Sequence, residues 1–101
     1  MDKLEKRRLF RQIIWDYNIP EEEIEAVLDG RKDQAGHYTR KMLFRKILET
    51  YPWFTIVQLF SRNEIQNLLT DDVIEKLRIP SLRTQYEFVQ KRLREVIPVS
   101  G

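Results

Sequence analysis

Residues 70–96 decide the fold, and they read TDDVIEKLRIPSLRTQYEFVQKRLREV. In the second half of this stretch apolar residues recur at steps of four and three, at Leu82, Tyr86, Val89, Leu93 and Val96. Such a stripe is typical of an amphipathic helix that packs along one face. Thr70 and the two aspartates after it favour an earlier helix start, and Ile79-Pro80 separates the two segments. The stretch therefore predicts two consecutive helices.

The same helical spacing continues upstream of that stretch. A third helix is predicted from an apolar face made of Leu43, Phe44, Ile47, Leu48 and Tyr51. Thr39 is placed to cap its start, and Ser61 with Glu64 has the spacing of a capping box. Residues 53–60 are apolar nearly all round, with Pro52 expected in the first helical turn. We interpret them as a short buried helix, because no second strand is predicted for them to pair with.

The N-terminal part of the chain also has a helical pattern. Residues 1–20 predict a basic first helix whose apolar face is Leu9, Phe10, Ile13, Ile14 and Tyr17. Pro20 is expected in the first turn of a second helix, and Gly30 is expected just after its end. Residues 31–38 have no periodicity and predict a loop, and residues 98–101 form a tail.

Together these patterns predict an all-α fold, a compact orthogonal bundle of about six short helices. A chain of 101 residues is the length of one domain, so residues 1–101 are expected to fold as a single unit. The predicted core includes Leu43, Ile47, Leu48, Val89 and Leu93.

Composition excludes several kinds of catalytic or cofactor site. The chain has no Cys, which excludes thiolate nucleophiles and sulfur-ligated metal sites, and one His, which excludes multi-histidine metal sites. Its three Gly are too few for a glycine-rich loop that binds phosphate. The acids at 21–25 favour a helix N-terminus rather than a metal ion, because consecutive helical residues point in different directions. His37 is expected to be exposed in the loop. We therefore expect no enzyme activity, cofactor or metal.

No membrane span or export signal is expected. Residues 1–10 are charged, and the longest uncharged stretch, residues 50–61, is well short of the about 20 residues that a spanning helix needs. A cytoplasmic location is the expectation that follows.

Cations and large aromatics supply the candidate contact residues. The net charge of +2 carries no argument by itself, but bases and acids alternate in blocks along the chain. The last helix is predicted to be the main contact surface through its basic side. The candidate contacts are Arg83, Lys91, Arg92 and Arg94, together with Trp15 and Trp53.

Several short blocks resemble a family of small bacterial helical proteins that are often encoded beside nucleotidyltransferase-type toxins of the abortive-infection class. The blocks are Trp15-Asp16-Tyr17, Leu43-Phe44-Arg45-Lys46-Ile47-Leu48-Glu49, Tyr51-Pro52-Trp53, Gln58-Leu59-Phe60, Leu77-Arg78 and Ser81-Leu82-Arg83. The likeness spans roughly residues 15–93 and rests mainly on apolar positions. It implies an antitoxin-like or regulatory protein and assigns no catalytic residue.

Two functions stay open from the sequence. The first is an interaction module with a protein partner or a second copy of itself, in the manner of an antitoxin. The second is a small DNA-binding transcriptional regulator. The third helix carries Arg40, Lys41, Arg45 and Lys46, and a turn around residues 77–81 precedes the basic last helix.

Overall fold

The structure is a computed structural model that describes residues 1–14 and 19–95. This part of the chain contains seven helices and one two-stranded hairpin. The helices are α1 (Lys3–Gln12), α2 (Glu21–Leu28), α3 (Arg40–Thr50), α4 (Trp53–Leu59), α5 (Arg62–Leu68), α6 (Asp71–Glu75) and α7 (Pro80–Glu95), and the strands are β1 (Gln34–Ala35) and β2 (Tyr38–Thr39). The predicted all-α class is confirmed.

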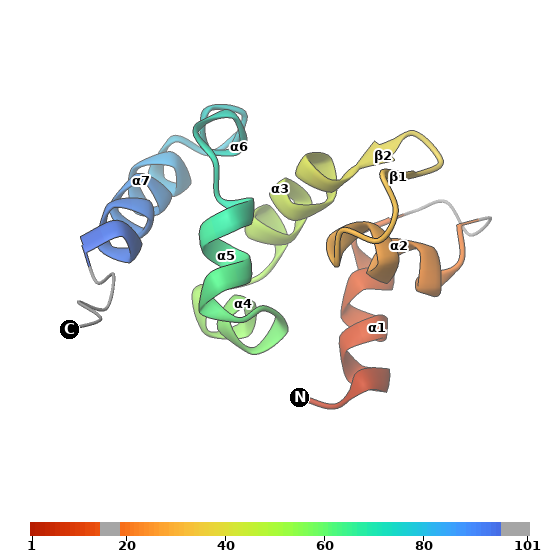
Figure 1. The fold of residues 1–101 in the computed structure, drawn as a ribbon. Helices are drawn as coiled ribbons and strands as arrows, with labels where there is room; N and C mark the ends of the chain where they lie inside the picture. Colours follow the sequence, from red (N-terminus) through yellow and green to blue (C-terminus); the bar gives the residue numbers. More distant parts are fainter. Residues whose placement is uncertain (15–18, 96–101) are drawn as a thin grey trace.

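Helix α3 lies in the middle of the molecule (Figure 1). On one side, α2 and the hairpin contact α3, and α1 packs against α2. On the other side, α4 and α6 contact α3, and α7 packs against α5 and α6. The result is elongated, with extents of 45 × 32 × 23 Å, and α7 lies at the end far from α1.

Local signals fix most helix boundaries as predicted. The Thr39 hydroxyl accepts a hydrogen bond from the Met42 amide at the start of α3. Ser61 and Glu64 form the reciprocal capping box of α5, and Thr70 caps α6. Gly30 follows the last turn of α2 at φ +82°, a backbone conformation that favours glycine.

The two prolines expected inside a first helical turn lie one position earlier. Pro20 and Pro52 are the N-cap residues of α2 and α4, both with extended backbone. Neither offers a capping side chain. Three glutamates in the first turn of α2 instead stabilise the start of the helix, because their negative charges lie at the positive end of the helix dipole.

The core lies where α3 meets its neighbours. Leu43, Phe44, Ile47 and Leu48 are buried, as predicted. Rings from three different segments meet here: Phe60 lies 5.9 Å from Phe10 and 5.4 Å from Phe44, centroid to centroid. These contacts join α1, α3 and the end of α4 into one apolar cluster.

The first helix is shorter than predicted, because α1 ends at Gln12 rather than near residue 20. Ile13 and Ile14 are still buried, but they lie beyond the helix, and the Arg11 guanidinium donates to the Ile19 carbonyl across the connection. Helical spacing therefore identifies Ile13 and Ile14 as apolar-face residues but does not mark the end of the helix before them. Tyr17 and Trp15 lie outside the described residues.

The predicted loop at 31–38 forms most of the β1–β2 hairpin, which spans residues 34–39. Gln34 pairs with Thr39 and Ala35 pairs with Tyr38 in antiparallel register. Gly36 turns the chain with φ +58°. Strands of two residues are too short to show an alternating pattern, so periodicity misses them.

Among the described residues, none of the helices combines the length and the apolar character needed to cross a membrane.

Candidate functional site

The apolar stripe of α7 is only partly used by the core. Tyr86 is 1% exposed, and its ring meets Trp53 edge-on at 6.2 Å between centroids. Leu82, Val89 and Leu93 are partly buried against the core. The prediction that Val89 and Leu93 are core residues is therefore wrong in degree, since each keeps an accessible side.

One polar contact fixes α7 onto the body of the protein. The Gln90 side-chain amide donates to the Leu69 carbonyl and to the Asp71 carboxylate, both at 3.0 Å. These acceptors lie at the junction of α5 and α6, so the middle of α7 is tied down. The half-buried side chains on either side of it are consequently held in place rather than free to collapse.

Two adjoining hollows lie along the second half of α7, where it faces α4 and α5. Their volumes are about 370 and 360 Å³, and both are lined by Trp53, Arg62 and Leu93. The other lining residues are Phe88, Val89 and Arg92 in the first hollow, and Val57, Phe60, Ser61 and Ile65 in the second. We call this continuous depression the α7 groove.

Large apolar side chains at the α7 groove are open to solvent. Phe88 is 63% exposed and Val57 is 46% exposed. An exposed aromatic beside half-buried Trp53, Val89 and Leu93 makes a contiguous apolar surface rather than an isolated residue. Such clustered exposure is typical of an interaction site.

The groove is also positively charged. Among the described side chains that line it, the charged ones are Arg62 and Arg92, and none is acidic. Arg92 lies 3.7 Å from Glu95 across one turn of α7. Lys91 and Arg94 are exposed on neighbouring positions of the same helix end. An acidic ligand would therefore meet several cations at this end.

The structure brings some predicted contact residues together and separates others. Trp53 and Arg92 both line the α7 groove. Arg83 lies near the start of α7, nine residues before Arg92 or about 13 Å along a helix. Lys91 and Arg94 do not line the groove, and Arg94, two residues after Arg92, projects from a different side of α7. Trp15 lies outside the described residues.

Sequence reasoning missed Phe88 and Arg62. Phe88 lies off the four–three stripe of α7, and a large aromatic off the buried stripe of a surface helix is a signal of exposure. Arg62 lies at the first position of α5, where no sequence pattern marks it. Its role depends on the packing of α5 against α7.

The groove offers binding surface and little chemistry. Ser61 is the hydroxyl among its described lining residues, and its oxygen accepts the Glu64 amide as the α5 cap. Burial raises the pKa of Tyr86 to about 12, so this phenol stays protonated at neutral pH.

His37 is exposed in the hairpin with its ring 4.2 Å from that of Tyr38.

In residues 1–14 and 19–95, no group of three His, Asp or Glu side chains is placed to hold a metal ion. No family model, curated protein or solved structure matches the chain. The resemblance to toxin-associated helical proteins stays a prediction.

Proposed function

We propose that this protein is a non-enzymatic interaction module that binds a partner protein in the α7 groove. The observation that carries the proposal is the contiguous apolar lining, with Phe88 63% exposed at its edge. An aromatic side chain held in this way beside a hollow supplies the kind of anchor that dominates protein interfaces.

The proposed occupant is an amphipathic helical segment that carries acidic residues. Its apolar side chains would fill the hollows beside Trp53 and Leu93, as in helix-in-groove recognition. Its carboxylates would meet Arg62 and Arg92 at the rim. Charge complementarity of this kind steers association and fixes the orientation of the partner.

The same charges disfavour a second copy of the chain as the occupant. A symmetric dimer brings the same surface patch of both subunits together. Arg62 and Arg92 of one subunit would then approach those of the other, and Glu95, the acid beside Arg92, is already paired with it. Like charges across an interface oppose association.

Nucleic acid is the less favoured partner for α7. A recognition helix reads bases with residues near its N-terminus. Here the first turns of α7 carry one cation, the half-buried Arg83, whereas Lys91, Arg92 and Arg94 lie at the opposite end. This distribution places the basic end of α7 beside the protein-binding groove rather than at the helix N-terminus that would enter DNA.

The resemblance noted in the sequence supplies the first partner class to test. A nucleotidyltransferase-type toxin with an exposed acidic helix would fit the groove, and this chain would then act as an antitoxin-like or regulatory subunit. The proposal of a protein-binding groove stands independently of that partner class.

Fluorescence anisotropy with a labelled acidic amphipathic peptide tests the proposal. Phe88→Ala should weaken binding by about tenfold or more, the effect typical of an anchor residue. Phe54→Ala is the matched control, because Phe54 is 66% exposed on α4 but does not line the groove. A version of the peptide with lysine in place of each glutamate should bind weakly.

Two outcomes would contradict the proposal. Equal weakening by Phe54→Ala and Phe88→Ala would show that binding follows general apolar exposure rather than the groove. Equal affinity for the acidic and basic peptides would remove the role given to Arg62 and Arg92. Concentration-dependent sedimentation that Phe88→Ala abolishes would instead identify a second copy as the occupant.

A further inference from the structure

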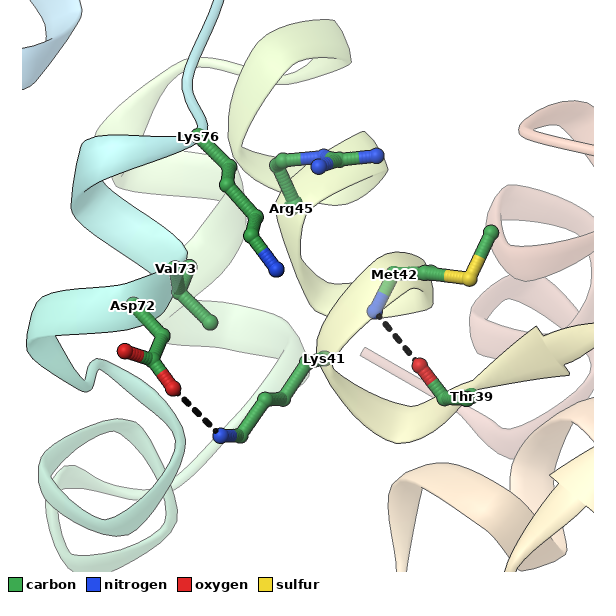
Figure 2. A pocket seen from close by; sticks show the side chains of 7 residues that line it. All are labelled: Thr39, Lys41, Met42, Arg45, Asp72, Val73 and Lys76. Atoms are coloured by element: carbon green, nitrogen blue, oxygen red, sulfur yellow. Dashed lines mark hydrogen bonds and ion pairs between the residues drawn. The ribbon is translucent and has the colours of Figure 1, made fainter.

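A second, separate depression lies between α3 and α6. Its volume is about 270 Å³, and its lining residues are Thr39, Lys41, Met42, Arg45, Asp72, Val73 and Lys76 (Figure 2). Val73 and Met42 supply apolar walls. The charged side chains that line the cleft are Lys41, Arg45 and Lys76, which are cations, and Asp72, which is a carboxylate. The cleft therefore carries an excess of positive charge.

The carboxylate neutralises one of the three cations. Lys41 donates from Nζ to Asp72 Oδ2 at 2.9 Å, and this contact joins α3 to α6. The Lys41 ammonium lowers the pKa of Asp72, so the carboxylate is ionised at neutral pH. The pair occupies one end of the cleft.

The other two cations, Arg45 and Lys76, make no ion pair in the described part of the chain. Figure 2 shows the Lys76 ammonium pointing into the space between Val73 and Met42. Lys76 makes no hydrogen bond there, but its positive charge acts with that of Lys41 to lower the pKa of Asp72. Arg45 lies at the end of the cleft away from Asp72, with its guanidinium turned away from Lys76 and Asp72 (Figure 2), and its Nε is buried with no hydrogen-bond partner. A buried donor without an acceptor is uncommon in a folded protein.

Three other cations from α1 to α3 are already engaged. Arg7 bonds Glu25 at 2.9 Å, and Lys32 bonds Glu23 at 2.7 Å. Lys46 lies over the Tyr38 ring at 5.7 Å, although it follows Arg45 directly in the sequence. Arg45 and Lys76 differ from these three cations, because neither makes an ion pair or a ring contact in the described part of the chain.

We propose that the α3–α6 cleft binds a phosphoanion, meaning a phosphate or diphosphate group. Three cations against one carboxylate suit a multiply charged anion better than a ligand that carries a single carboxylate group. Arginine and lysine donors are the usual partners of phosphate oxygens. The group could belong to a free phosphorylated molecule or to a nucleic-acid backbone, and the test separates these sources.

Asp72 gives the proposal a directional prediction. Its carboxylate repels an incoming anion and holds the Lys41 ammonium. Asp72→Asn removes the negative charge and frees Lys41 for the ligand, so it should strengthen phosphoanion binding. The Thr70 cap of α6 stays in place in this variant.

The experiment is an NMR titration of the isotope-labelled protein with pyrophosphate, with a short DNA duplex in a parallel arm. We expect amide shifts confined to residues 39–45 and 72–76. The Arg45→Gln/Lys76→Gln variant should bind pyrophosphate about tenfold more weakly, the usual effect of losing charge-assisted hydrogen bonds. Lys46→Gln is the matched control on α3 and should bind as the wild type does.

Each outcome bears on the proposal. Pyrophosphate shifts at the cleft without duplex shifts support a free phosphorylated ligand. Duplex shifts at the same amides that pyrophosphate displaces support a nucleic-acid source. The proposal is overturned if neither probe shifts the cleft, if Lys46→Gln weakens binding as much as the double variant, or if Asp72→Asn weakens it. Unchanged spectra of the free variants show that each is folded.

Discussion

Replacing Tyr86 by alanine is the sharpest test of how α7 divides its surface between core and groove. The side chain is 1% exposed, and its ring packs edge-on against Trp53 at 6.2 Å. Removing a buried aromatic costs about 3 to 5 kcal/mol through lost burial and the cavity left behind. The edge-on contact adds about 0.5 to 1.5 kcal/mol.

A loss of this size is a large fraction of the about 5 to 15 kcal/mol that stabilises a typical domain. Tyr86→Ala should therefore show a strongly reduced urea midpoint in far-UV circular dichroism. Phe88→Ala, two residues away and 63% exposed, should change the free energy of unfolding by less than about 1 kcal/mol. This contrast follows directly from the opposite directions of the two side chains.

The reasoning would be refuted by either of two results. A cost below about 1 kcal/mol for Tyr86→Ala would mean that α7 does not pack on Trp53 as described. A cost for Phe88→Ala as large as that for Tyr86→Ala would place Phe88 in the core, and the α7 groove would then not exist in solution.

Three further predictions use the same purified protein. Leu48→Ala should lower the free energy of unfolding by about 2 to 5 kcal/mol in urea titration, because Leu48 is 2% exposed; a loss under about 1 kcal/mol would show an accessible face. Burial raises the pKa of Tyr86 to about 12 in the folded protein, from about 10 in an unfolded chain. The protonated phenol therefore contributes fully to the free energy of unfolding below pH 10, and this contribution is lost as the pH rises through 12. That loss is about 2 to 3 kcal/mol, and Tyr86→Phe should flatten this part of the profile; an unchanged profile would contradict it. Replacing Lys91, Arg92 and Arg94 together by glutamine should slow association with the acidic peptide in stopped flow while changing its dissociation little; an unchanged association rate would remove their steering role.

Helix boundaries were predictable because their signals are local. Thr39 and Ser61 each bond an amide three residues ahead, so neighbouring sequence positions are sufficient. The end of α1 was not predictable, because Ile13 and Ile14 are apolar at helical spacing and buried, yet lie beyond the last residue of the helix. The spacing of apolar residues therefore predicts which residues are buried more reliably than it predicts where a helix ends.

The site residues depend on contacts between distant segments. Trp53 was identifiable as a large aromatic at a helix end, but its neighbour Phe88 becomes significant only when α7 lies beside α4. Lys41 and Asp72 are 31 positions apart and meet because α6 packs on α3. The sequence blocks of like charge do not show such pairings, since these follow from tertiary structure.

The most direct test of the protein-binding groove follows the indole N–H of Trp53 by NMR during addition of the acidic amphipathic peptide. The chain has two tryptophans, and a Trp15→Phe variant assigns the Trp53 signal. A peptide seated in the groove should shift this signal together with the amides of Phe88, Val89 and Leu93, and Phe88→Ala should reduce the shift. Binding that leaves the Trp53 signal and these amides unchanged would contradict the account.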